Sequence, residues 1–132
     1  SIVNFYRQTS QVGSISVTTS ATSYNSSSDY RLKENVIPIT NAVERLKQLK
    51  PSRFNFKADA NKTVDGFLAH EAQTVVPESV TGIKDAVDEN GNPDYQSIDH
   101  SKLVPLLTGA LQEALGKIEE LESRIGDLES VQ

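Results

Sequence analysis

Apolar residues recur at alternating spacings of three and four through the C-terminal part of the chain. The row runs over four heptads, and its members fill the a and d positions: Val104, Leu107, Leu111, Ala114, Ile118, Leu121, Ile125 and Leu128. At the flanking g and e positions, Lys117 is matched with Glu122 and Arg124 with Glu129, which are the pairs that opposite charges join between parallel chains. The pattern predicts a long helix in a parallel coiled coil. The alternative is a surface helix of a monomer, and the pattern alone leaves the number of strands open, because Ala114 weakens the usual a and d rule.

The start of this helix is marked by a proline. Because proline is tolerated in the first turn of a helix, Pro105 predicts an N-cap shortly before it. Ser101 is the first candidate and Asp99 is the alternative. His100, between them, is expected to be a capping or surface residue.

The middle of the chain mixes helical and strand-like patterns. Residues 39–49 have apolar positions at helical spacing between two prolines, so they predict an amphipathic helix. Residues 53–57 alternate with a period of two, as in a strand with one buried face. Residues 64–69 form a second apolar run, and residues 70–76 predict a short helix that ends at a proline.

A hairpin is predicted next. The Asn-Gly pair at residues 90–91 is typical of a hairpin tip, here between strands at residues 83–87 and 95–98. The acidic and amide residues around this tip lack the ligand spacing and the closing glutamate of an EF-hand loop. We therefore predict a polar turn, and no metal site or cofactor.

The first 28 residues differ in composition from the rest. They carry a single charge, Arg7, and 13 of them are Ser or Thr. Residues 2–6 and 15–18 are β-branched or aromatic and predict strands, which Gly13 separates. This segment cannot bury a core alone, so it is either a linker or the end of a fibrous β-stalk that other chains complete.

These patterns predict an α+β protein in three parts. Residues 1–28 are the end of the stalk, residues 29–100 form a small mixed body of short strands and helices, and residues 101–132 form the coiled-coil helix. A body of this size is marginally stable alone and would gain from oligomerisation.

Composition removes several classes of function. The chain has 132 residues and a net charge of −5, which argues against binding nucleic acid. It has no cysteine, which excludes a disulfide framework and a thiol nucleophile, and no apolar run of membrane-spanning length. It has no methionine either, so we expect a piece of a longer polypeptide.

Three motifs resemble a known family. They read SDYRLKENV at residues 28–36, GFLAHE at 66–71 and SIDHSKLVPLL at 97–107. In this order they resemble the C-terminal intramolecular chaperone domain of phage endosialidases, tail fibres and neck appendages. The resemblance covers about residues 28–125.

The resemblance implies a homotrimer at the end of a triple-stranded β-helical fibre. Such a module helps three chains of a phage tail fibre or tailspike precursor fold in register in the bacterial cytoplasm. It then releases itself by cutting the bond between Ser28 and Asp29. The family's paired serine and lysine fall on Ser28 and Lys33, so the resemblance implies a self-cleaving peptidase.

The chemistry of such a pair is plausible. A serine hydroxyl needs a base, and a lysine serves when burial or nearby cations favour its uncharged form. Arg31 is a candidate to repel the lysine proton or to bind an oxyanion, and Asp29 and Asn35 are candidates to shape the scissile turn. His70 is a supporting residue, and its simpler interpretation is a structural histidine.

The attacking group stays open. Attack by Ser28 on the preceding carbonyl would break the bond between Ser27 and Ser28, and attack on its own carbonyl would need a four-membered ring. A cut after Ser28 therefore points to a water, the Asp29 carboxylate or a serine of a neighbouring chain.

Two other functions compete with self-cleavage. A cap that trimerises the fibre and stays attached would need the heptads but not Ser28 and Lys33. A peptidase that acts on other proteins is disfavoured, because the sequence shows no second catalytic set.

Overall fold

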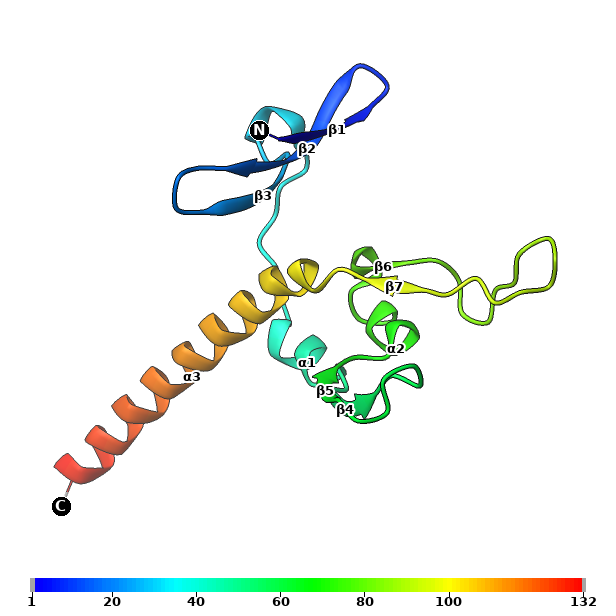
Figure 1. The fold of residues 1–132 in the computed structure, drawn as a ribbon. Helices are drawn as coiled ribbons and strands as arrows, with labels where there is room; N and C mark the ends of the chain where they lie inside the picture. The colour runs from blue at the N-terminus through cyan, green and yellow to red at the C-terminus, as the bar shows by residue number, and fades with distance from the viewer. Residues whose placement is uncertain (1, 132) are drawn as a thin grey trace. The chain divides into compact units, whose positions relative to one another are not determined.

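The computed structural model describes residues 2–131. The chain forms two compact units, which divide between Pro38 and Ile39 (Figure 1). The functional boundary predicted at Ser28 and Asp29 lies within the first unit and stays a prediction. Short strands in small sheets and one long C-terminal helix confirm the predicted mixed class.

The first unit is an antiparallel three-stranded sheet. Its strands β1 (Val3–Arg7), β2 (Ser10–Val17) and β3 (Thr22–Ser26) pair in sequence order. The two predicted strands are confirmed, and β3 was not predicted. The prediction that Gly13 separates strands was wrong, because Gly13 lies inside β2 and the turn falls at Gln8, which has a φ of 56°.

Gly13 is required for close packing instead. A Cβ at this position would lie 2.8 Å from the Asn25 carbonyl oxygen of β3, which is closer than side chains tolerate. Apolar residues of the sheet such as Phe5 and Tyr24 are exposed, and among residues 2–38 no side chain is buried, so the described part of this unit has no core of its own. A small sheet with exposed apolar side chains needs another segment or another chain to pack against it.

The second unit begins with helix α1 (Ala42–Leu46). The helix predicted over residues 39–49 is therefore shorter, and residues 39 and 40 are not helical. Its start is fixed by Asn41, whose left-handed conformation (φ 54°, ψ 35°) ends the extended segment before it.

A two-stranded sheet and a short helix follow. Strand β4 (Ser52–Asn55) pairs antiparallel with β5 (Thr63–Gly66), which confirms the predicted strand at residues 53–57 in all but its last two residues. Helix α2 (Ala69–Gln73) confirms the short helix predicted there, and the 3-10 turn η2 (Pro77–Ser79) begins at the predicted proline.

The predicted hairpin is only partly right. Its turn at the Asn-Gly pair is present, with Gly91 at φ 79°. Regular pairing is restricted to β6 (Val80–Thr81) and β7 (Ser97–Ile98), and only a single bridge joins Val87 to Pro93 between them. Left-handed Gly82 and Asp85 interrupt the extended run, and Pro93 has no N–H to donate to a ladder.

The long helix α3 spans Val104–Ser130 and has 27 residues, with the predicted proline in its first turn. A 3-10 turn, η3 (His100–Leu103), leads into it. Ser101 is not the N-cap. Its amide and hydroxyl donate to Asp99 Oδ1 at 3.0 and 2.6 Å, so the alternative, Asp99, caps the helical stretch.

The core lies where α1, the residues that follow α2 and the start of α3 meet. Its buried side chains are Ala42, Val75, Val76, Leu103, Leu106 and Ala110. Only the beginning of α3 contributes to this core, so most of the helix is not buried within the chain. Among residues 2–131, no helix is long and apolar enough to cross a membrane.

Removing one core side chain should test this packing. Leu106 is 2% exposed, and we expect Leu106→Ala to lower the free energy of unfolding by about 2–5 kcal/mol, since it leaves a cavity. Ile83 is 75% exposed, and Ile83→Ala should change it by less than about 0.5 kcal/mol. Urea unfolding measures both values, and equal losses would contradict the assigned core.

Candidate functional site

The backbone on both sides of Ser28 is held in place. Before it, the Ser27 amide donates to the Val12 carbonyl at 3.1 Å, and the Ser27 hydroxyl donates to the Gln11 carbonyl at 3.2 Å. After it, Asp29 caps the 3-10 turn η1 (Tyr30–Leu32). The bond between Ser28 and Asp29 thus joins the end of a sheet to the start of a helical turn.

Arg31 binds the Asp29 carboxylate through its backbone amide and its guanidinium. The Arg31 amide and Nε both donate to Asp29 Oδ1 at 2.9 Å, and its Nη2 donates to Oδ2 at 2.9 Å. The guanidinium, and then the amide, hold the pKa of Asp29 below its usual range. The pair fixes the residue that follows the predicted cut, and it engages both oxygens of the carboxylate.

Lys33 follows the 3-10 turn η1, and its side chain contacts Ser28. Its amide donates to the Tyr30 carbonyl at 3.1 Å, which closes the turn, and its Nζ donates to Ser28 Oγ at 2.7 Å. The structure therefore brings together the serine and lysine that the sequence singled out. Both residues are exposed to solvent in this single chain.

This arrangement has the reach that general base catalysis needs. A base must lie about 2.6–3.2 Å from the group whose proton it takes. An uncharged Lys33 amine at the observed position would accept the Ser28 proton rather than donate to its oxygen. Since Arg31 occupies the Asp29 carboxylate, the geometry argues against that carboxylate as the attacking group in this conformation.

The supporting residues are spread over both units. Asn35 is exposed and left-handed, with φ 53°, two residues after Lys33. His70 lies on α2 in the second unit and is half-buried, beside Lys84, Asp85 and Tyr95. His100 packs its ring against Phe67, at a centroid distance of 6.2 Å.

The predicted interface residues lie along one exposed face of α3. Leu111 is 62% exposed and Ile118 is 50% exposed, although both are apolar. The adjoining face, which carries Leu106 and Ala110, packs into the core. The chain therefore buries one side of its helix and leaves the heptad row uncovered: Val104, Leu107, Leu111, Ile118, Leu121, Ile125 and Leu128, with Ala114 half-buried.

One residue with a clear structural role was not predicted from the sequence. Glu113 of α3 accepts hydrogen bonds from the first two amides of α1. Its position in the heptad gives no local signal, since its partners lie 70 and 71 residues away. Within residues 2–131, no group of three or more acidic or histidine side chains is arranged to hold a metal ion.

Comparison with protein families places this geometry in context. Residues 28–81 match the family Peptidase_S74, described as chaperone of endosialidase. Over these residues the chain is similar to the chaperone-of-endosialidase family. This confirms the resemblance to the family; the match begins at Ser28 and includes the first two of the three motifs.

Two phage proteins are similar over a longer stretch. The long tail fiber proteins Gp37 of Enterobacteria phages K3 and T2 are each 29% identical to the chain over 102 residues. These alignments cover 74% of this chain, but only 8% and 7% of the two fibre proteins. The chain thus spans less than a tenth of the length of these relatives.

Proposed function

We propose that this chain is an intramolecular chaperone of a phage tail fibre. It joins three copies in register and then releases itself by cutting between Ser28 and Asp29. The observation that carries the proposal is the 2.7 Å contact between Lys33 Nζ and Ser28 Oγ, at the residue where the chaperone-of-endosialidase match begins.

The exposed face of α3 supports assembly. A helix of 27 residues is about 40 Å long, and most of its stability in a protein comes from packing an apolar face. Here the core takes up only the first turns, which leaves the heptad row for other copies of the helix. Parallel copies would also join Lys117 to Glu122 and Arg124 to Glu129 between chains.

The sheet before the cut supports a fibre partner. Its strands expose apolar side chains on a sheet with no core, as expected for a segment that is completed by the same segment of other copies. In such stalks a slip of one residue turns every side chain to the wrong face, so a device that sets the register has a clear use. The similarity to tail fibre proteins favours a virion fibre as the parent.

Assembly would also complete the site. Four apolar residues that lie near Lys33 in the sequence are largely exposed in the single chain: Tyr30, Leu32, Val36 and Ile37. If neighbouring chains cover this patch, Lys33 loses water, which favours the uncharged amine that a base requires. The dyad is then competent only in the assembled state.

The cut itself is best written with water as the attacking group. Lys33, as a free amine, takes the proton of the Ser28 hydroxyl, whose oxygen in turn takes a proton from water, and the water oxygen attacks the Ser28 carbonyl carbon. The bond from that carbon to the Asp29 nitrogen then breaks. The Asp29 amine takes up the proton, so one water is consumed and two chains result.

Intact mass spectrometry of the purified chain tests the function. We expect one product that ends at Ser28 and one that begins at Asp29, and their masses should sum to the uncut mass plus one water. A folded, trimeric chain that stays uncut would support a permanent trimerisation cap instead. A cut before Ser28 would indicate an acyl shift at the preceding carbonyl.

Removing the Arg31 guanidinium should slow the cut. Arg31→Gln releases the Asp29 carboxylate and loosens the turn that carries Lys33, so we expect a cleavage rate about tenfold lower. Arg53 makes a similar exposed pair with Asp65, at 2.8 and 3.2 Å, and is a matched control. Arg53→Gln should cut at the rate of the unchanged chain, and an equal loss in both variants would contradict a specific role for Arg31.

A further inference from the structure

Helix α1 begins without a cap of its own. Asn41 occupies the N-cap position, but its side chain makes no capping hydrogen bond. Ala42, the first helical residue, is fully buried. Its amide and that of Val43 are among the donors that a helix leaves unsatisfied, and such donors are costly when buried without a partner.

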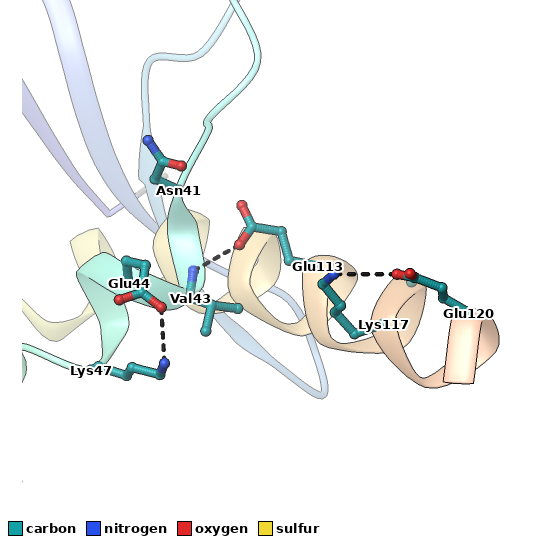
Figure 2. A pocket seen from close by; sticks show the side chains of 8 residues that line it. Asn41, Val43, Glu44, Lys47, Glu113, Lys117 and Glu120 are labelled. Atoms are coloured by element: carbon teal, nitrogen blue, oxygen red, sulfur yellow. Dashed lines mark hydrogen bonds and ion pairs between the residues drawn. The ribbon is translucent and has the colours of Figure 1, made fainter. Parts of the chain in front are cut away.

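Glu113 supplies both partners from the long helix. Its Oε1 accepts from the Ala42 amide at 2.8 Å, and its Oε2 accepts from the Val43 amide at 2.9 Å. Figure 2 shows the Glu113 carboxylate pointing from α3 to the start of α1. These bonds, first that of Val43 and then that of Ala42, hold the pKa of Glu113 below its usual range, so the carboxylate stays charged.

The charged neighbours of Glu113 are engaged elsewhere. In the same groove, Lys47 pairs with Glu44 at 2.9 Å, and Lys117 pairs with Glu120 at 3.2 Å (Figure 2). Neither lysine therefore accounts for the placement of Glu113. Its hydrogen bonds to the two amides do.

A glycine brings the two helices close enough for this contact. A Cβ on Gly109, one turn before Glu113, would lie 3.2 Å from the Ala42 Cβ and 3.7 Å from Ile39 Cγ2. The close approach at Gly109 and the carboxylate of Glu113 together attach residues 39–43 to α3.

The chain between this attachment and Lys33 is otherwise unsupported. Residues 34–41 are exposed, and in the described structure none of residues 34–40 makes a hydrogen bond. Before these residues, the Lys33 amide donates to the Tyr30 carbonyl; after them, the Asn41 carbonyl accepts from the Arg45 amide and the Ala42 amide donates to Glu113. Hydrogen bonds therefore hold this segment only at its two ends.

We propose that Glu113 is a positioning residue for the cut. Its hydrogen bonds fix the point at which the segment that follows Ser28 and Lys33 is attached to α3. When copies of α3 associate, their association then determines where each Ser28 and Lys33 lie. This inference rests on the proposed function. Glu113 lies on α3 in the second unit, and the cut takes place in the first unit. Glu113 therefore affects the cut only through the covalent chain that joins the two units.

Cleavage rates of matched variants test the inference. Glu113→Gln keeps the size of the side chain, but its amide nitrogen cannot accept the second hydrogen bond. We expect this variant to remain trimeric and to cut about tenfold more slowly. Glu120→Gln, on the same groove of α3, should cut within about twofold of the unchanged chain, because Glu120 only pairs with Lys117 at the surface.

Comparison with Leu106→Ala separates positioning from stability. Leu106 has no contact with the α1 amides, and its removal should cost more folding stability than Glu113→Gln. Under conditions in which both variants are folded, the cleavage rate of Leu106→Ala should nevertheless be higher than that of Glu113→Gln. Rates that simply follow stability would overturn the inference.

The remaining outcomes separate a failure of the proposed function from a failure of the role of Glu113. If Glu113→Gln does not fold, Gly109→Ala replaces it, because the added methyl group crowds Ala42 while the carboxylate stays. A trimeric Gly109→Ala variant that cuts at the unchanged rate would overturn the inference. If the unchanged chain does not cut, the proposed function fails, whereas equal rates in Glu113→Gln and the unchanged chain overturn the role of Glu113 alone.

Discussion

Replacing Ser28 or Lys33 by alanine is expected to leave the chain uncut. Ser28→Ala removes the hydroxyl that Lys33 contacts, and Lys33→Ala removes the base, so the rate should fall by about 100-fold or more in each case. Intact mass measured over time after purification gives the rate. Both variants should still assemble, because neither residue lies on α3.

Two further substitutions make this test specific. Lys33→Arg keeps a positive charge and a donor, but arginine stays protonated and cannot act as a base, so this variant should also stay uncut. Lys57 is an exposed lysine of the other unit, and Lys57→Ala should cut normally. Rapid cutting by Lys33→Arg would show that the position needs a charge rather than a base.

Placing carboxylates in the heptad row is expected to abolish both assembly and cutting. Leu111→Asp combined with Ile118→Asp puts two charges at a positions of the proposed coiled coil, where burial of an unpaired charge is very costly. The variant should be monomeric in analytical ultracentrifugation. It should also stay uncut, because the apolar patch around Lys33 is no longer covered.

A control with the same charge change keeps this result interpretable. Gln112→Asp combined with Ser123→Asp adds two carboxylates on exposed positions of α3 outside the a and d row. This variant should assemble and cut as the unchanged chain does. A monomeric Leu111→Asp and Ile118→Asp variant that cuts at full rate would contradict the coupling of cutting to assembly.

The long helix was predictable because its signal is local and repeated. Eight apolar positions in a and d register fix the element and its exposed face without knowledge of the rest of the chain. Strand β3 was missed for the opposite reason. Its sequence, TSYNS, is polar, and it forms because β2 offers it a partner.

The limits of α1 depend on contacts far away in the sequence. Apolar spacing continues through residues 39–49, but Asn41 is left-handed and the first amides of the helix bond to Glu113. Such a cap leaves no motif near the helix that it serves. The predicted hairpin was only partly right for a similar reason. The left-handed conformation of Asp85, which interrupts the extended run, is not evident from its residue type alone.

The serine and lysine pair was found through resemblance rather than chemistry. A serine and a lysine five residues apart are common in any sequence, and only the three motifs in order singled out Ser28 and Lys33. Asp29 was predicted to help shape the scissile turn, but the residues alone did not predict that this turn brings the Ser28 and Lys33 side chains into contact. That turn depends on the cap at Asp29 and on its grip by Arg31.

The most direct test of the account follows assembly and cutting in the same sample. Freshly refolded chain is sampled over time by native mass spectrometry, at several protein concentrations. We predict that an uncut trimer appears first, that cut products arise only from it, and that dilution delays both. Cut monomers that appear before any trimer, at a rate independent of concentration, would contradict the claim that assembly licenses the cut.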